Sequence, residues 1–265
     1  MNAIKSTLPH SGFELLAVLR RMGGSARNAQ IAQVMGVSEE TVRRLVKALA
    51  KSGMVERVHG GTFLRGGEDM PVYSGNLGQN PKEKSRIARA VVDLISDGMT
   101  VFVNVGSTTT FVSERLRIRQ NLLIVTNSVS AAQVLAGHNS NKVFLAGGEI
   151  LHSERGAFGS ATEGYARQFT YDMAILGVDA LSAEHGFTLQ NPTEADLSRV
   201  VCGQANDVVI AADSSKFGAR APMVACTPSD VSTLVTDTTP PHKLAQALSD
   251  WGVGLRVALK REAYS

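Results

Sequence analysis

The sequence predicts an α/β protein of two units: a small N-terminal unit of three helices and a β-hairpin, then a larger unit built on a mostly parallel β-sheet. Three observations carry this prediction. Apolar residues recur at helical spacing before residue 52, and a short alternating stretch with a Gly-Gly pair follows. From residue 82, short Val/Ile/Leu-rich runs alternate with helical segments. Continuous apolar strands separated by helices are typical of a parallel sheet covered on both faces.

The stretch 38–52, SEETVRRLVKALAKS, has the features of a helix that reads DNA. Ser38 is a suitable N-cap, and apolar residues recur every three or four positions on one face. The other face is basic. We expect this helix to contact DNA through Ser38, Glu40, Thr41, Arg43, Arg44 and Lys47. An ordinary solvated amphipathic helix would share the pattern, so the flanking segments decide between the two interpretations.

The segments before this helix favour the DNA-binding interpretation. Residues 26–35 predict a preceding helix, and Gly36-Val37 supplies the short glycine-containing turn of a helix-turn-helix. An apolar run over residues 13–19 predicts the helix that covers the other two. Three helices in this order are the minimal support for a recognition helix.

The segment after the helix predicts a β-hairpin. Residues 54–58 alternate as a strand does, Gly60-Gly61 is a turn signal, and residues 62–64 return as a second strand. Arg57 and His59 lie near the tip of this wing, where cations contact phosphates or a minor groove. We therefore add both residues to the predicted DNA-binding face.

The run VSEETVRRLVKALAKSGMVERVHGG resembles the N-terminal signature of DeoR-type bacterial transcription regulators. It departs from the family at one position, where Leu45 replaces the usual aspartate after two arginines. The resemblance implies a winged helix-turn-helix domain over residues 9–65, with the helix-turn-helix at about 26–47 and the wing at 54–64. A Gly- and Pro-rich linker over 66–81 and an effector-sensing domain over 82–260 would follow.

Charge and composition fit this division. Residues 1–65 carry a net charge of +6 and residues 66–265 a net charge of −3, as expected of a DNA-binding head on a ligand-sensing body. No apolar run is long enough to span a membrane, and the N-terminus lacks a signal-peptide core. Cys202 and Cys226 lack metal-type spacing and are expected to be free thiols. We expect a cytoplasmic protein without a cofactor or a bound metal.

The larger unit shows a regular succession of elements. Strands are predicted at 100–105, 122–126, 142–146, 172–176, 207–212, 233–236 and 256–259, with helices at 82–95, 110–116 and 129–135. Ligands of such sheets bind beyond the carboxyl ends of the strands, and polar turns follow several of these strands. A helix N-terminus and a mobile lysine there suit a phosphate. The predicted effector-binding residues are Asn104, Gly106, Ser107, Thr108, Thr109, Thr126, Asn127, Ser128, Gly147, Gly148, Asp179, Asp213 and Lys216.

Five segments of this unit resemble the successive motifs of the DeoR C-terminal domain: VNVGSTTTFVSERL, IVTNSVSAAQVL, VFLAGGEI, GVDALSAEHGFT and VVIAADSSKFG. The resemblance implies a Rossmann-like, sugar-phosphate-sensing domain related in fold to ribose-5-phosphate isomerase and coenzyme A transferases. The family often has aspartate where Asn104 stands, and Lys84 matches a position that is often basic in the family.

Two functions from different classes remain open from the sequence. The first is a repressor of a carbohydrate or polyol catabolic operon that binds operator DNA as a homodimer or homotetramer and is released by a phosphorylated sugar. The alternative is a sugar-phosphate isomerase with a fused head, using Asp179, Glu194, Asp213 and Lys216. No tight carboxylate pair marks an active site, and a head would have no purpose in an enzyme. We therefore predict a regulator with no catalytic residues.

Overall fold

The computed structural model describes residues 10–22, 25–58, 61–64 and 79–259. The chain divides into two compact units, Met1–Pro81 (the head) and Lys82–Ser265 (the sheet unit), each of which is described by itself. Most of the predicted linker and the wing residue His59 lie outside the described residues. Within the described ranges, no helix is long and apolar enough to cross a membrane.

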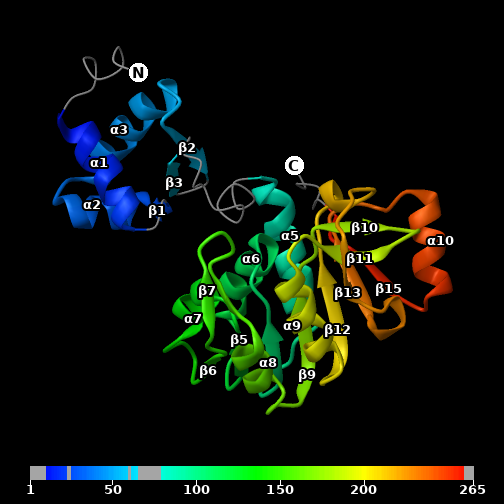
Figure 1. Ribbon diagram of the computed structural model, residues 1–265. Helices are drawn as coiled ribbons and strands as arrows, with labels where there is room; N and C mark the ends of the chain where they lie inside the picture. Colours follow the sequence, from blue (N-terminus) through cyan, green and yellow to red (C-terminus); the bar gives the residue numbers. More distant parts are fainter. Residues whose placement is uncertain (1–9, 23–24, 59–60, 65–78, 260–265) are drawn as a thin grey trace, which may run out of the picture. The chain divides into compact units, whose positions relative to one another are not determined.

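The head packs three helices against a small antiparallel sheet (Figure 1). The apolar stripes that the sequence indicates converge on one core, in which Leu15, Leu19, Ile31, Val42 and Leu49 are fully buried. The sheet has the order β1-β3-β2. The elements are α1 (His10–Arg21), β1 (Ser25–Arg27), α2 (Asn28–Met35), α3 (Glu39–Lys51), β2 (Val55–Val58) and β3 (Gly61–Leu64).

The junctions of the head confirm the predicted helix-turn-helix, with one correction. Gly36 ends α2 in the left-handed conformation at φ 65°, and Val37 packs half-buried against the core. The second helix begins at Asn28 and not at Ala26, because Ser25–Arg27 forms a third strand that pairs with β3. Sequence patterns missed this strand since its pairing partner lies 36 residues away, at Ala26↔Thr62.

The sheet unit is built on seven parallel strands, as predicted. Their order is β15-β14-β12-β9-β4-β5-β6, so the chain runs outward in one direction from β4 and in the other from β9. The point between β4 and β9 is a topological switch point, where ligands of open α/β sheets bind. The strands are β4 (Thr100–Val103), β5 (Leu123–Thr126), β6 (Lys142–Leu145), β9 (Tyr171–Leu176), β12 (Ala205–Ala211), β14 (Thr233–Thr236) and β15 (Gly254–Val257).

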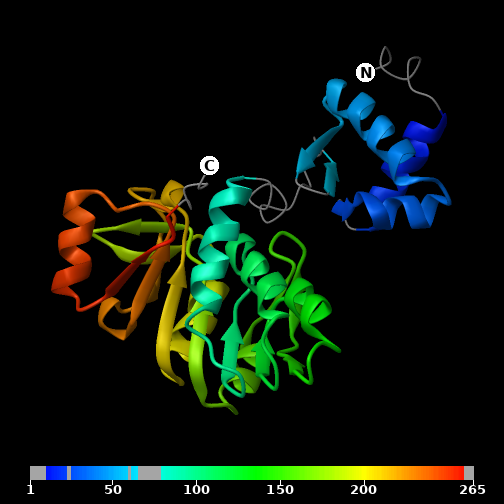
Figure 2. The same cartoon turned by 180° about the vertical axis from the view of Figure 1, so that it is seen from behind.

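Helices cover both faces of this sheet. One apolar core joins the sheet to α5 (Pro81–Val92), α6 (Ser107–Leu116) and α7 (Val129–Leu135). A second core on the opposite face joins it to α8 (Ser160–Ala166), α9 (Pro192–Cys202) and α10 (His242–Asp250). The α9 side faces the viewer in Figure 1 and the α5 side in Figure 2. Alternate residues of one strand serve the two cores, as Phe102 and Val103 do in β4.

Several short elements were absent from the sequence-based prediction. They form a hairpin, a separate three-stranded sheet of order β10-β11-β13, and two 3₁₀ turns. These are β7 (Glu149–Leu151), β8 (Gly156–Phe158), β10 (Ala180–Ser182), β11 (Gly186–Leu189), η1 (Ser214–Lys216), β13 (Met223–Cys226) and η2 (Pro228–Asp230). Helices α8, α9 and α10 were also not predicted. Several predicted bounds differ: α6 begins at Ser107 rather than at 110, the first helix of the unit ends at Val92 rather than at 95, and the last strand covers Gly254–Val257 rather than 256–259.

Candidate functional site

The predicted recognition helix is α3, and Ser38 caps it as expected. The Ser38 hydroxyl accepts from the Thr41 backbone N–H at 3.2 Å and lies 2.9 Å from the Thr41 hydroxyl oxygen. Leu45 is buried at 7% exposure, which confirms that it belongs to the core face. The residue that replaces the family's aspartate therefore supports the helix from beneath.

The exposed face of α3 presents two kinds of arginine. Arg43 is held by its own helix, with its guanidinium 3.3 Å from a Glu39 carboxylate oxygen and 3.4 Å from one of Glu40. Arg44 and Lys47 are exposed and pair with no other residue among those described. Such surface ion pairs are weak, so Arg43 can exchange its carboxylates for DNA, whereas Arg44 and Lys47 are already free. In the wing, Arg57 is exposed as well.

The switch point of the large sheet is bridged by Asn104, which follows β4. Its backbone N–H donates to Ile175 O at 3.1 Å, and its Oδ1 accepts from the Gly177 N–H at 3.0 Å. Its Nδ2 donates to Glu194 Oε1 at 3.4 Å. Asn104 is 2% exposed, so it ties the ends of β4 and β9 to the first turn of α9. Here the predicted site residue also fixes the geometry of the site.

Three predicted effector-binding residues at the end of β5 and directly after it form hydrogen bonds within the fold. Asn127 Oδ1 accepts from the Val105 N–H at 2.9 Å, and its Nδ2 donates to Ala157 O at 3.1 Å. The Thr126 hydroxyl donates to Val103 O and accepts from the Ser128 N–H, while the Ser128 hydroxyl caps α7. Because these groups are satisfied within the fold, their main effect is to hold the loop that follows β4.

The N-terminus of α6 faces the same edge. Gly106 has φ 156°, and a Cβ there would lie 2.9 Å from the Thr109 hydroxyl oxygen. The Thr109 hydroxyl donates to Gly106 O, whereas those of Ser107 and Thr108 form no hydrogen bond with the described residues. Free backbone N–H groups of the first turn and two uncommitted hydroxyls suit an anion.

Two lysines meet beyond the end of β12. Lys84 on α5 is 2% exposed, and its Nζ lies 3.8 Å from Asp213 Oδ2. Burial lowers the pKa of Lys84 to about 8; the Asp213 carboxylate opposes the shift and the nearby Lys216 ammonium adds to it. Lys216 ends η1, which is fixed because Asp237 accepts from the Ser214 N–H at 2.7 Å. The Lys84 ammonium therefore interacts with both the Asp213 carboxylate and the Lys216 ammonium.

Acidic groups lie on the α9 side of the same edge. Burial raises the pKa of Glu194 well above its ordinary value, and the Asp179 and Glu154 carboxylates add to that rise. Burial also raises the pKa of Glu154. The Lys216 ammonium opposes this rise in the pKa of Glu194. No group of three or more His, Cys, Asp or Glu in the described part of the chain could hold a metal ion.

The predicted Gly147-Gly148 pair follows β6. A Cβ at Gly148 would lie 2.2 Å from the Thr162 hydroxyl oxygen and 2.6 Å from Phe158 O, whereas a Cβ at Gly147 would meet nothing within 4 Å. The close approach at Gly148 is thus to the chain itself, between β6 and β8.

We expect Gly148→Ala to destabilise the protein by about 1–3 kcal/mol, because a backbone carbonyl must move to admit the methyl group. Gly147→Ala is the matched control and should change the free energy of unfolding by less than about 0.5 kcal/mol. Urea denaturation of both variants measures the difference. Equal stability of the two variants would contradict the crowding at Gly148.

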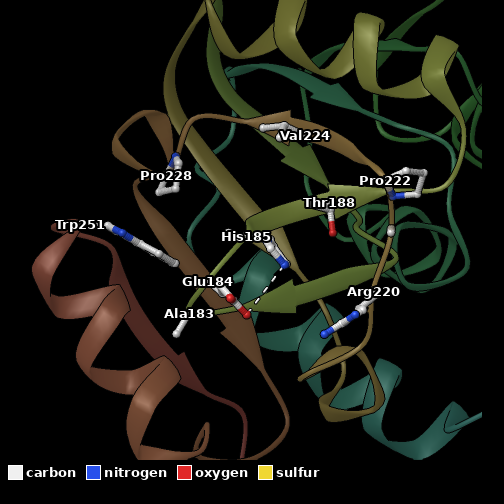
Figure 3. Close-up of a pocket in the computed structure, with 11 residues that line it drawn as sticks. Ala183, Glu184, His185, Thr188, Arg220, Pro222, Val224, Pro228 and Trp251 are labelled. Carbon is white, nitrogen blue, oxygen red and sulfur yellow. Dashed lines mark ion pairs between the residues drawn. The ribbon is translucent and has the colours of Figure 1, made fainter.

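A separate cleft of about 870 Å³ lies along the small sheet β10-β11-β13 (Figure 3). His185 and Glu184 form an ion pair there at 3.8 Å, opposite Trp251 and beside Arg220. None of the predicted effector residues lines it. Its charged lining residues, Glu184, His185 and Arg220, are exposed, so the buried charged groups at the switch point are the stronger candidate site.

Two candidate site residues, Lys84 and Glu194, were not among the predicted effector-binding residues. Both positions could be recognised in the sequence, because each charged residue occupies one position of an otherwise apolar helical stripe. Lys84 is spaced with the buried Ile87, Ala88 and Val91 of α5, and Glu194 with Leu197 and Val201 of α9. A charged side chain in a buried stripe is costly without a purpose, and such a position marks a candidate site.

Comparison with known proteins identifies both units. Residues 14–64 match the model of the DeoR-like helix-turn-helix domain, and residues 79–238 match that of the DeoR C terminal sensor domain. The chain is 30% identical over 254 residues to the glycerol-3-phosphate regulon repressor of Escherichia coli (strain K12), covering 96% of this chain and 100% of that protein. It is 29% identical to the HTH-type transcriptional repressor GlcR of Bacillus subtilis (strain 168), over 88% of this chain and 90% of that protein.

Among solved structures, ribose 5-phosphate isomerase A from Methanocaldococcus jannaschii matches with a TM-score of 0.39 at 20% identity, over 52% of this chain and 55% of that chain. The β subunit of eIF2B from Chaetomium thermophilum matches with a TM-score of 0.44 at 14% identity, over 64% of this chain and 53% of that chain.

Proposed function

Since the chain belongs to the DeoR family of DNA-binding transcriptional repressors, we propose that it represses a carbohydrate or polyol catabolic operon and that a phosphorylated sugar or polyol releases it from DNA. The alternative of an isomerase with a fused head is wrong, because relatives that cover nearly the whole chain are transcriptional repressors.

In this proposal α3 enters the major groove of the operator. Its exposed Arg44 and Lys47 bind phosphates or base edges directly, and Arg43 joins them by leaving Glu39 and Glu40. Arg57, with His59 beyond it in the chain, contacts the backbone or the minor groove from the wing. Ser38 and Thr41 mainly fix the start of the helix.

A single head buries too little surface for tight specific binding, so we propose that the protein is a homodimer or homotetramer that pairs heads on repeated half-sites. Half-sites on one face of the duplex would lie about 10 base pairs apart, or a multiple of that distance. Light scattering of the full chain tests this: a monomer that still binds its operator with full affinity would contradict it.

The observation that carries the effector proposal is the pair of lysines at the sheet edge. The Lys84 ammonium is buried 3.8 Å from the Asp213 carboxylate, and the Lys216 ammonium lies close enough to lower the pKa of Lys84, so two positive charges gather at this edge. A phosphate dianion would supply the missing negative charge and accept hydrogen bonds from the α6 N-terminus. One relative is a glycerol-3-phosphate regulon repressor, and glycerol 3-phosphate is therefore the first probe.

We expect glycerol 3-phosphate to bind the full chain about tenfold more weakly at pH 9 than at pH 7. The pKa of Lys84 is lowered to about 8, so the lysine loses its charge over this range. A phosphate monoester stays dianionic there, since its second pKa is about 6. Calorimetric titrations at pH 7, 8 and 9 and constant ionic strength measure the effect.

The variant Lys84→Met should bind more weakly at pH 7 and lose most of this pH dependence. Lys82→Met, exposed in the same turn of α5, is the matched control and should behave as the parent does. A parent-like pH profile in Lys84→Met would remove Lys84 from the site. Failure of glycerol 3-phosphate, other phosphorylated sugars and inorganic phosphate to bind at all would contradict the effector proposal.

A further inference from the structure

Glu194 is a buried carboxyl group at the switch point for which the fold alone gives no sufficient reason. It lies in the first turn of α9, which Asn191 caps by accepting from the Thr193 N–H at 2.9 Å. Its side chain is 8% exposed. Oε1 accepts from Asn104 Nδ2 at the long distance of 3.4 Å, and Oε2 accepts no hydrogen bond from any described residue. Burying a carboxyl group with so few partners is costly.

The residues around Glu194 further increase the free-energy cost of burying its ionised form. Burial raises its pKa well above the ordinary value, and the Asp179 and Glu154 carboxylates raise it further. The opposing charge is Lys216, which does not form an ion pair with it. Asn104 would be satisfied equally well by a glutamine carbonyl at this position. The Asn104 contact places this carboxyl group at the sheet edge where ligands bind, and among the described residues no group donates to Oε2.

We propose that Glu194 binds hydroxyl groups of the effector, so that the site accepts phosphorylated polyols and neutral sugars and rejects phosphorylated sugar acids. This inference rests on the proposed effector function. At one end of the site, Lys84, Lys216 and the α6 N-terminus bind the phosphate of the effector. At the other end, Glu194, together with Asp179 and Glu154, faces the hydroxyl-bearing part of the effector.

Charge explains the rejection. A ligand carboxylate in place of a terminal alcohol would add a further negative charge beside the buried Glu194, whose pKa burial and then the Asp179 and Glu154 carboxylates already raise. An alcohol in the same place donates a hydrogen bond to a carboxyl oxygen. A site of this kind discriminates strongly between alcohols and carboxylates, because a ligand that cannot donate a hydrogen bond leaves the buried acceptor without a partner.

Matched ligands test the selectivity of the full chain. Calorimetry compares glycerol 3-phosphate with 3-phosphoglycerate, and glucitol 6-phosphate with 6-phosphogluconate; within each pair only one terminal CH₂OH is replaced by a carboxylate. Inorganic phosphate is the reference. We expect at least one alcohol to bind about tenfold more tightly than both phosphate and its acid partner. An acid that binds as tightly as its alcohol overturns the inference.

Variants of Glu194 assign the selectivity to this residue. Glu194→Leu, which keeps a buried side chain of similar size, should bind the alcohol no better than phosphate. Glu194→Gln should keep the preference of the parent to within about threefold, because an amide both accepts from Asn104 and bonds a hydroxyl. Glu184→Leu removes an exposed carboxylate in the other cleft and is the control.

The outcomes separate the two proposals. If Glu194→Leu binds phosphate as the parent does and keeps the full preference for the alcohol, Glu194 does not read hydroxyls. If the parent binds phosphate but neither alcohol more tightly, the inference is overturned while a phosphate site stands. If the parent binds none of the five compounds, the proposed effector function fails and the inference fails with it.

Discussion

Lys216→Ala should bind operator DNA as the parent does and no longer be released by the effector. The lysine belongs to the sheet unit, and its ammonium lies near Lys84 and Glu194 at the switch point. A charge-assisted hydrogen bond to phosphate is worth about 1.5–3 kcal/mol, so effector affinity should fall by about tenfold or more. Because an effector shifts a conformational equilibrium only by its differential affinity for the two states, release should be lost to a similar extent.

Fluorescence anisotropy of a labelled operator, titrated with effector at fixed salt, measures this result. Lys142→Ala, an exposed lysine of β6, is the matched control. The double change Ser107→Ala with Thr108→Ala should act in the same direction more weakly, because neutral hydroxyl contacts are worth less than charged ones. Release of Lys216→Ala at the effector concentration that releases the parent would show that the phosphate does not bind here.

Arg44→Ala should weaken operator binding by about 1–3 kcal/mol, the range of a base-reading arginine, while the sheet unit keeps its affinity for the effector. The side chain is exposed on α3 and forms no ion pair with the described residues, so it loses no internal partner when it is removed. Arg43→Ala should have the smaller effect of the two, because Arg43 must first leave Glu39 and Glu40.

The operator itself is obtained by selecting random duplexes with the full chain and sequencing those that bind. Affinity is then measured at several salt concentrations, since a lost phosphate contact lowers the salt dependence and a lost base contact relaxes sequence preference. Arg117→Ala, an exposed arginine of the sheet unit, controls for net charge. Parent-like affinity of folded Arg43→Ala and Arg44→Ala would remove α3 from the proposed DNA interface.

Elements with strong periodicity could be predicted from the sequence, whereas elements that depend on distant pairing could not. Helix α3 was predictable because Ser38 marks its start and four apolar residues mark its inner face. Strand β1 could not be predicted, since three residues are too few to show an alternating pattern and their pairing partner β3 is remote in the sequence. The small sheet β10-β11-β13 was missed for the same reason.

The candidate site was predictable in its place but only partly in its members. Polar turns after parallel strands locate a sheet edge, and the order of β4 and β9 makes that edge a switch point. The sequence does not reveal that the Asn127 side-chain amide forms hydrogen bonds with the backbone of Val105 and Ala157, because such partners are set only by the folded chain. Nor does it reveal that Lys84 on α5 approaches Asp213, since 129 positions separate them in the chain.

The central claim is that one chain binds DNA with its head and is released when a phosphorylated compound binds its sheet unit. The most direct measurement is anisotropy of the labelled operator with the full chain, titrated with phosphorylated sugars and polyols and with each unphosphorylated counterpart at fixed salt. We expect at least one phosphorylated compound to release the operator and its unphosphorylated counterpart to leave it bound. An operator that stays bound in every titration, or that is released equally by the unphosphorylated compound, would contradict it.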